Sequence, residues 1–132
     1  MTDGEVVYLD LDDIVRIHGR IFQIERSAAR DRLRDPTALE SALCRPINHA
    51  AYQTADLASQ AAILAHGIAQ SQSFLDGNKR TALIAMTTFL ALNGWDVGLP
   101  DTRLAERILG FAQGVPPNTL ADELRPSLTP RR

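Results

Sequence analysis

Five consecutive residues in the middle of the chain, Asp76-Gly77-Asn78-Lys79-Arg80, combine a carboxylate, a glycine, an amide and two adjacent cations. The Asp-Gly pair predicts a turn, because glycine adopts backbone angles that other residues avoid. Asn78 is a favourable helix N-cap, which would place Lys79 and Arg80 in the first turn of a following helix. This combination of groups is suited to bind a phosphate.

The two cations stand at an electrostatically unfavourable end of the predicted helix. A helix N-terminus carries about half a positive charge, and each cation placed there costs roughly 0.3–1 kcal/mol. An anion would relieve this repulsion, and free helix N–H groups flanked by Lys79 and Arg80 form a ready phosphate site. Alternatively, Asp76 neutralises one cation and solvent screens the other, so that the segment only connects two helices. The residues alone leave both interpretations open.

Phosphoryl or nucleotidyl transfer would divide the work among these residues, because it needs positioning and charge neutralisation more than covalent chemistry from the protein. Asp76 is suited to hold Mg²⁺. Asn78 and the backbone N–H groups near Gly77 are suited to hydrogen-bond the phosphates. Lys79 supplies a point charge, whereas the planar guanidinium of Arg80 matches the spacing of phosphate oxygens.

Two apolar segments flank this site and predict the central helices of an all-α fold. The first, 57–71, is apolar on nearly every side, which is typical of a buried helix. His66 within it is interpreted as a packed structural residue rather than a catalytic one. The second helix, 79–93, ends at Gly94 in a favoured C-cap position. Phe74, between the two helices, is interpreted as a buried anchor for the loop.

The other elements follow from apolar periodicity, caps and prolines. We expect a single domain over 1–132, folded as a compact bundle of about six helices. Asp10 is expected to cap a first helix, on which His18 is a structural histidine bonded to a neighbouring carbonyl. Before the central helices we expect a solvated loop at 25–34, a helix from Asp35-Pro36 to about Cys44 that is halted by Pro46, and a loop at 47–55. After them we expect an extended stretch at 95–99 and a helix that begins at Pro100-Asp101 and is ended by Gly114. A short helix capped by Thr119 and stopped by Pro126 follows, with a disordered tail from about 126.

Composition excludes several classes of protein. The 132 residues carry a net charge of −2, which argues against a dedicated nucleic-acid binder. Aromatic residues make up 5%, so Ala, Leu and Ile must fill the core, which favours close-packed helices. The single Cys44 rules out an internal disulfide framework and is interpreted as a small buried residue. No signal-peptide pattern or transmembrane run is found, so a cytoplasmic protein is expected.

The residues Phe-Leu-Asp-Gly-Asn-Lys-Arg-Thr-Ala at 74–82 resemble the core motif of the Fic/Doc superfamily, His-x-Phe-x-Asp/Glu-Gly-Asn-Gly/Lys-Arg. With Lys79 in the variable position, the motif is most similar to that of the Doc toxins of toxin–antitoxin pairs. The likeness extends to residues 8–9 and 17–18, to residues 33–35 and 39–43, and to residues 89–94, and is therefore spread over most of the chain. The resemblance implies a Fic-like helical fold, with ATP and Mg²⁺ as cofactors.

One position departs from the motif. The histidine that would stand two residues before Phe74 is the general base of the family, and here that residue is Gln72. A glutamine side chain does not accept a proton at neutral pH. Either the substitution is a deliberate inactivation of a harmful protein, or the chain is a naturally degenerate member. In both cases the pocket would still bind nucleotide while its chemistry is impaired.

The resemblance also implies a reaction and partners. Fic proteins with glycine at the position of Lys79 generally transfer AMP to a protein hydroxyl, whereas Doc toxins move the terminal phosphate of ATP to a threonine of elongation factor Tu. Lys79 favours the kinase, with an AMP transferase and a catalytically dead binding module as alternatives. Thr102 and Glu106 have the spacing of the family's inhibitory helix, but Arg107 breaks its pattern. Control would then come from an antitoxin whose C-terminal segment occupies a groove.

The segment 47–55 shows no helical period and resembles the family's flap, a hairpin that pairs with the target backbone. Its Asn48, His49 and Tyr52 are candidate substrate contacts. Taken without the resemblance, the segment is equally consistent with a plain surface loop.

Overall fold

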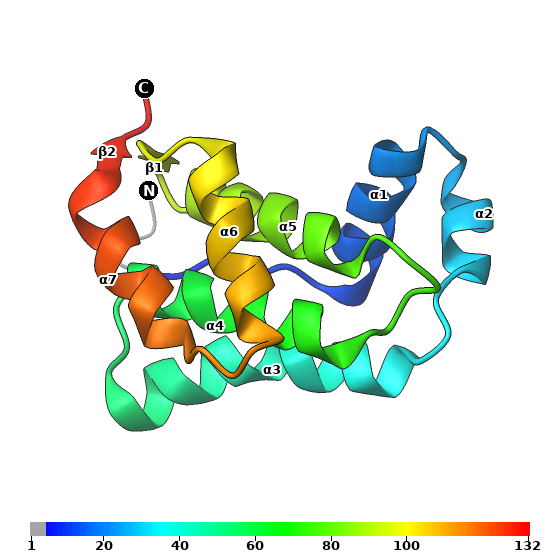
Figure 1. Cartoon of the computed structure of the whole chain (residues 1–132), viewed down its shortest axis with the longest axis horizontal. Helices are drawn as coiled ribbons and strands as arrows, with labels where there is room; N and C mark the ends of the chain where they lie inside the picture. The colour runs from blue at the N-terminus through cyan, green and yellow to red at the C-terminus, as the bar shows by residue number, and fades with distance from the viewer. Residues whose placement is uncertain (1–4) are drawn as a thin grey trace.

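The computed structural model describes residues 5–132, and this part of the chain folds as seven helices with one two-stranded sheet (Figure 1). The predicted all-α class is therefore confirmed. None of the helices in the described part combines the length and apolar character needed to cross a membrane. The elements in order are α1 (Leu11–Phe22), α2 (Arg26–Asp31), α3 (Pro36–Gln53), α4 (Leu57–Ser71), α5 (Asn78–Leu92), β1 (Trp95–Val97), α6 (Asp101–Phe111), α7 (Pro117–Ser127) and β2 (Leu128–Pro130).

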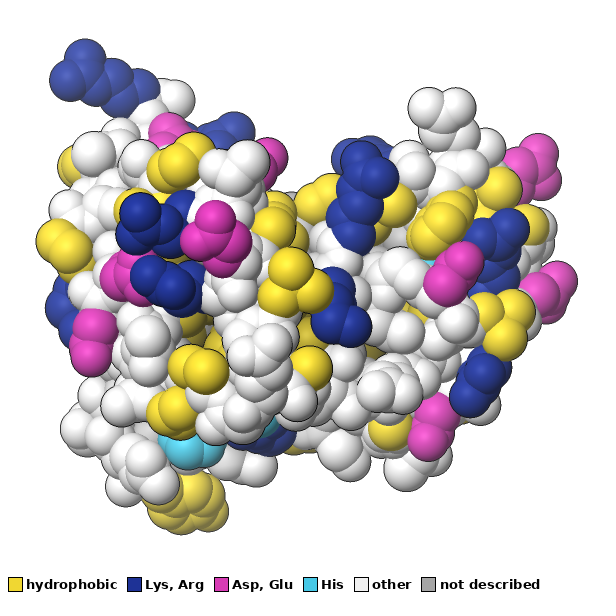
Figure 2. Space-filling model, viewed as in Figure 1, with side chains coloured by type: hydrophobic (Ala, Val, Ile, Leu, Met, Phe, Trp, Pro, Cys, Tyr) yellow, Lys and Arg dark blue, Asp and Glu magenta, His cyan; other side chains and the backbone are white. Residues whose placement is uncertain are grey.

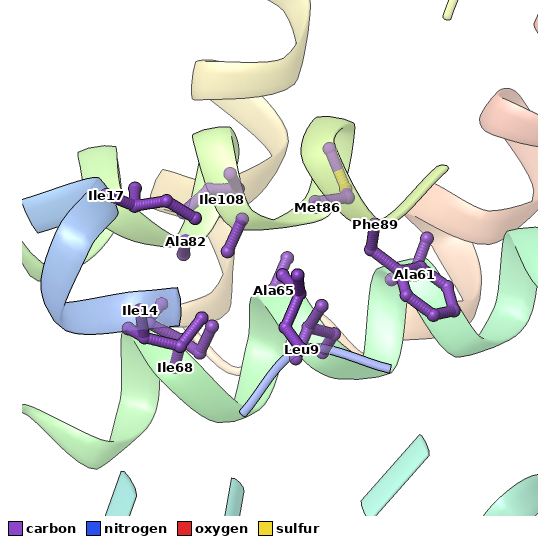
Figure 3. Packing of buried hydrophobic residues seen from close by; sticks show 14 of the residues in the cluster. Leu9, Ile14, Ile17, Ala61, Ala65, Ile68, Ala82, Met86, Phe89 and Ile108 are labelled. Carbon is purple, nitrogen blue, oxygen red and sulfur yellow. The ribbon is translucent and has the colours of Figure 1, made fainter. Parts of the chain in front are cut away.

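The helices α4 and α5 form the centre, as the apolar segments predicted (Figure 1). Small residues let their backbones approach closely: Ala61 and Ala65 on α4 and Ala82 on α5 have no exposed surface. Figure 3 shows the larger side chains around them, with Ile68 of α4 and Phe89 of α5 among those that close the core. The remaining helices pack around this pair, so the loop that joins α4 to α5 is held by a rigid frame.

The predicted N-caps Asp10 and Asp35 are confirmed. Asp10 forms a reciprocal capping box with Asp13, and the Asp35 carboxylate accepts a hydrogen bond from the Ala38 N–H at 3.0 Å. The predicted loop at 25–34 is wrong in part, because it contains α2. This six-residue helix buries only Ala29, which packs against Gly19 of α1. A single buried alanine produces no apolar period, so the pattern could not reveal the helix.

The helix α3 is longer than predicted and continues through Pro46 to Gln53. An interior proline removes a hydrogen bond and normally breaks a helix. Here Pro46 is buried, and the same helix lies so close to α4 that a Cβ added at Gly67 would come within 3.0 Å of the Ala42 Cβ. This packing stabilises the helix past the proline. The expected flap hairpin or loop at 47–55 is therefore wrong, because residues 47–53 are helical.

The C-terminal region also differs from the prediction. Pro116, not Thr119, is the N-cap of α7, and the helix passes Pro126 to end at Ser127. The tail is ordered, because β2 pairs with β1 in an antiparallel register that places Trp95 opposite Pro130. Beyond the sheet, the Arg131 guanidinium lies 2.9 Å from the Asp96 carboxylate. The predicted extended stretch at 95–99 is confirmed in β1, and it supplies the partner that orders the tail.

Candidate functional site

The loop between α4 and α5 pairs, in the manner of a strand, with the segment that follows α2. Leu33, in the segment after α2, forms an isolated antiparallel bridge with Phe74. The Arg34 N–H donates to the Ser73 carbonyl at 2.7 Å, and the Leu75 N–H donates to the Arg32 carbonyl at 3.0 Å. Backbone bonds on both sides of Phe74 therefore fix the path of the loop before it reaches Asp76.

Asn78 is not the N-cap of α5, contrary to the prediction. The cap is Gly77, in the left-handed conformation at φ 74°, and Asn78 is the first helical residue. The Phe74 N–H donates to Asn78 Oδ1 and Asn78 Nδ2 donates to the Phe74 carbonyl, both at 3.0 Å. The Asn78 amide thus closes the loop on itself. Whether it also contacts a phosphate stays a prediction.

Replacing Asn78 with alanine should lower the free energy of unfolding by about 1–3 kcal/mol, because two polar groups of the part-buried Phe74 backbone lose their partner. Chemical denaturation of the two proteins measures the difference. Asn48→Ala is the matched control, since Asn48 is exposed on α3, and its cost should stay within about 0.5 kcal/mol. Equal losses in the two variants would contradict the closing role of Asn78.

A cavity of about 490 Å³ opens beside the loop, and we call it the motif cavity. It is lined by Ala69, Gln72, Asp76, Gly77, Asn78, Lys79 and Arg80. It gathers every motif residue to which a phosphate, metal or catalytic role was assigned from the sequence. Asn78, Lys79 and Arg80 form the first turn of α5, which has no side-chain cap. The N–H groups of such a turn are free to bind an anion.

Around the cavity, positively charged side chains outnumber negatively charged ones. Asp76 Oδ1 lies 3.9 Å from Arg32 Nη1. Among residues 5–132, no carboxylate lies within ion-pairing distance of Lys79 or Arg80. Both cations are exposed and line the cavity, and Asp76 forms its ion pair with Arg32 rather than with either of them. The net charge at this helix end is positive.

Gln72 ends α4 in the left-handed conformation, at φ 48°. Its side chain is exposed and lines the same cavity as Asp76 and Arg80. The position at which the motif resemblance implies a general base therefore borders the predicted phosphate site. A glutamine at this place can donate and accept hydrogen bonds but cannot carry a proton away.

The surroundings of Asp76 fit a magnesium ion that is bound together with a nucleotide. No group of three or more His, Cys, Asp or Glu side chains that could form a protein-only metal site occurs in the described part of the chain. Mg²⁺ commonly takes one or two carboxylates and completes its shell with water and phosphate oxygens. Asp76 is exposed beside the cavity and provides one such carboxylate, from which Arg32 is separated by 3.9 Å.

Three side chains proposed as substrate contacts lie elsewhere. Asn48, His49 and Tyr52 belong to the C-terminal half of α3, which runs away from the loop to the opposite end of the molecule (Figure 1). His49 lines a separate cavity of about 310 Å³ with residues of α4 and α7, and Tyr52 is 86% exposed. The structure does not bring them to the motif, and a role in holding substrate stays a prediction.

The two histidines interpreted as structural both pack against aromatic rings, but the hydrogen-bond partner of His18 differs from the prediction. His66 lies edge-on to Phe111 with ring centroids 4.9 Å apart, and its Nδ1 is 3.0 Å from Arg45 Nη1. His18 is fully buried, and its Nδ1 lies 3.3 Å from Thr81 Oγ1 rather than from a backbone carbonyl. The exposed Cys44 differs from its interpretation as a buried residue.

Sequence reasoning missed Arg32, which borders the site from the segment after α2. Its guanidinium carbon lies 4.9 Å above the ring of Phe22, and its carbonyl receives the Leu75 N–H. These contacts hold Arg32 where its guanidinium pairs with Asp76. The only signal in the sequence was that Leu33 and its neighbours belong to the wider resemblance, because an arginine in a charged stretch does not reveal its partner.

A second cavity of about 500 Å³ shares Lys79 and Arg80 with the first. It lies between α5 and α6, and Leu83, Ile84 and Leu109 give it an apolar wall. Figure 2 shows the surface hollowed above α5, between α6 on the left and α1 on the right, with Lys or Arg side chains beside the hollow. We call this cavity the α5–α6 groove.

A family model described as Fic/DOC family matches residues 8–90, which is more than half of the chain and includes the whole loop. No curated protein matches the chain.

Proposed function

Since the chain belongs to the Fic/DOC family, we propose that it binds ATP with Mg²⁺ at the motif cavity and has the architecture of a protein kinase of the Doc type. Members of the family are typically transferases that move AMP or phosphate from a nucleotide, which supports the coarser assignment. The phosphates would lie over the first turn of α5. Asp76 would hold the metal, and Lys79 and Arg80 would neutralise the phosphate charge.

One observation carries this proposal. The uncapped N-terminus of α5 and two cations without a carboxylate partner in the described chain line one cavity with Asp76 and Gln72. Such an arrangement is unfavourable when empty of anions, because the helix end and both side chains repel one another. Bound phosphate would remove that repulsion. When bound, Mg²⁺ would neutralise phosphate charge, and the protein's own groups would orient the reactants.

Lys79 supports phosphate transfer over AMP transfer. It stands where the AMP-transferring members carry a second glycine, and it lines both the motif cavity and the α5–α6 groove. A long cation at this point occupies space and charge that a diphosphate would need. We therefore propose that the nucleotide presents its terminal phosphate to the acceptor. The proposed acceptor is a threonine hydroxyl of elongation factor Tu, whose phosphorylation would arrest translation.

Gln72 favours a second candidate function. Because no proton acceptor stands at the position of the general base, the chain as it is would act as a nucleotide-binding module with little transfer activity. Both candidates predict nucleotide binding. They differ in what a restored histidine would do.

The α5–α6 groove supports a proposal about regulation. Its apolar wall and the exposed Leu109, 54% accessible, suit the apolar face of an amphipathic helix. Lys79 and Arg80 at its end would attract a carboxylate from that helix. We propose that the C-terminal segment of an antitoxin occupies this groove and, through the two cations, competes with the nucleotide.

The nucleotide proposal is tested by titrating ATP with Mg²⁺ into the purified protein and measuring binding by calorimetry. Arg80→Ala should weaken binding about ten- to hundredfold, because a hydrogen bond to a charged group contributes about 1.5–3 kcal/mol. Arg131→Ala is the control, since Arg131 pairs with Asp96 beyond the other end of α5 and should leave affinity unchanged. Absence of ATP binding by the unaltered protein would overturn both candidate functions.

A further inference from the structure

One histidine lies beneath the motif loop and takes no part in the cavity. His18 of α1 has no exposed surface. Its ring is stacked on Phe74, with centroids 4.0 Å apart and planes 8° from parallel, and it is tilted against Phe22 at 4.7 Å. Its Nδ1 lies 3.3 Å from Thr81 Oγ1. One ring therefore contacts Phe74 at the start of the loop and Thr81 in the first turns of α5.

The same ring also lies under Gly77, the N-cap of α5. A Cβ added at Gly77 would come within 3.5 Å of His18 Cε1 and within 2.6 Å of Phe22 Cε2. The loop backbone thus approaches the His18 and Phe22 rings closely. The three points of contact span residues 74–81, and residues 76–80 within this stretch line the motif cavity.

The polarity of His18 is otherwise unexplained. Its Nε2 is buried and has no hydrogen-bond partner among the described residues. Burying a polar atom without a partner is unfavourable, and an apolar side chain of similar size would fill this place without that cost. The histidine therefore contributes something that packing alone does not require, and its one polar contact is with Thr81.

We propose that His18 is a positioning residue for phosphate binding: the ring, by stacking on Phe74 and bonding Thr81, holds the N-terminus of α5 in the orientation that grips phosphate. The proposal rests on the proposed function, because it concerns the same cavity. His18 touches neither nucleotide nor reacting atoms. It acts through Phe74, Gly77 and Thr81. Its loss should therefore reduce the affinity for phosphate while the rest of the protein stays folded.

The buried surroundings of His18 favour the neutral form of its ring. Burial, and secondly the charge of Arg32, lower the pKa of His18, while Asp76 opposes them by raising it. In the protonated ring both nitrogens carry a hydrogen, and the Nε2–H would find no acceptor within the described residues. Because the unfolded chain takes up that proton first, stability is complete above the ordinary histidine pKa of about 6.5 and declines as the pH falls below it. Phosphate binding by the folded protein should decline only as the pH falls through the His18 pKa of the folded state, which lies below that ordinary value.

ATP with Mg²⁺ is the probe for the test, with affinity measured by calorimetry and the loop followed by amide NMR of residues 77–80. His18→Phe keeps the stack and removes the bond to Thr81, so ATP affinity should fall about tenfold while the protein stays folded. Thr81→Val should reproduce this loss, and the double variant should be no worse than either single variant, because the two residues act through one contact. His66→Phe is the control for a packed histidine away from the loop.

The pH profile separates positioning from general stability. As the pH falls through the lowered His18 pKa, the affinity of the unaltered protein should drop more steeply than that of His18→Phe. Comparing the two proteins cancels the titration of ATP itself. Equal ATP affinity in both proteins, or additive losses in the double variant, would overturn the proposal. If the unaltered protein binds no ATP, the proposed function fails, and amide NMR alone then tests whether His18 positions the N-terminus of α5. His18→Phe or, if that variant does not fold, Thr81→Val must then shift the amides of residues 77–80 where His66→Phe does not; unchanged amides would again overturn it.

Discussion

Replacing Gln72 with histidine is expected to raise the rate of group transfer from ATP by about 10²–10⁴-fold, the usual contribution of a general base. Gln72 already faces the cavity that holds Asp76 and Arg80, so the new imidazole would stand beside the reacting phosphate without movement of the loop. The left-handed backbone at φ 48° is no obstacle, because histidine is among the residues enriched in that conformation. The substitution adds a proton acceptor and little else.

The measurement uses purified protein, elongation factor Tu and ATP labelled at either the α or the γ phosphate. Label from the γ position on the acceptor supports the kinase, and label from the α position supports an AMP transferase instead. The matched control is Gln23→His, because Gln23 is also a left-handed C-cap, at φ 55°, but ends α1. If Gln72→His stays as inactive as the control with both labels, the binding module becomes the better account of the chain.

Expression in bacteria extends the same test to the proposed toxin. Growth arrest by Gln72→His, relieved when the cognate antitoxin is produced with it, would support both the activity and the partner. Substituting Leu109 in the α5–α6 groove with aspartate should abolish that relief while leaving the arrest, because the exposed leucine lines the groove and lies on a different helix from the motif. Relief that persists would place the antitoxin on another surface.

The central helices and the motif cavity were predictable because their signals are local. The apolar runs over α4 and α5 specify buried helices wherever they pack, and the turn at Gly77 is signalled by the adjacent Asp76-Gly77 pair itself. By contrast, α3 passes through Pro46 because of its packing on α4, and β2 is ordered because β1 lies beside it. Both outcomes depend on residues far away in the chain, which propensity and local pattern do not contain.

The support of the site was hidden for the same reason. His18 and Arg32 lie 40 or more residues before the loop they border, and neither belongs to the motif. Local reasoning also assigned Asn78 a capping role, whereas its amide is bound to the Phe74 backbone four residues earlier. A motif thus shows which groups face a ligand. The residues that hold those groups in place become visible only when the fold brings them together.

The Gly77→Ala substitution should have the largest effect on the fold of the site. A left-handed alanine costs about 1–2 kcal/mol, and the added Cβ would lie 2.6 Å from Phe22 Cε2 and 2.8 Å from Phe22 Cζ. Since overpacking typically adds 1–3 kcal/mol, the free energy of unfolding should fall by about 2–5 kcal/mol, with loss of ATP binding. Denaturant titration and calorimetry measure the two effects.

Gly114→Ala separates the two causes, because Gly114 is also left-handed, at φ 90°, yet an added Cβ there would meet nothing within 4 Å. Its cost should be the backbone strain alone, and its ATP affinity should be unchanged. Combining Gly77→Ala with Phe22→Ala should remove the collision, so that the second substitution costs less in the Gly77→Ala background than in the unaltered protein. If Gly77→Ala proves no more harmful than Gly114→Ala, the loop does not depend on its close approach to α1, and the phosphate site must be held open by the bonds of Phe74 and Asn78 instead.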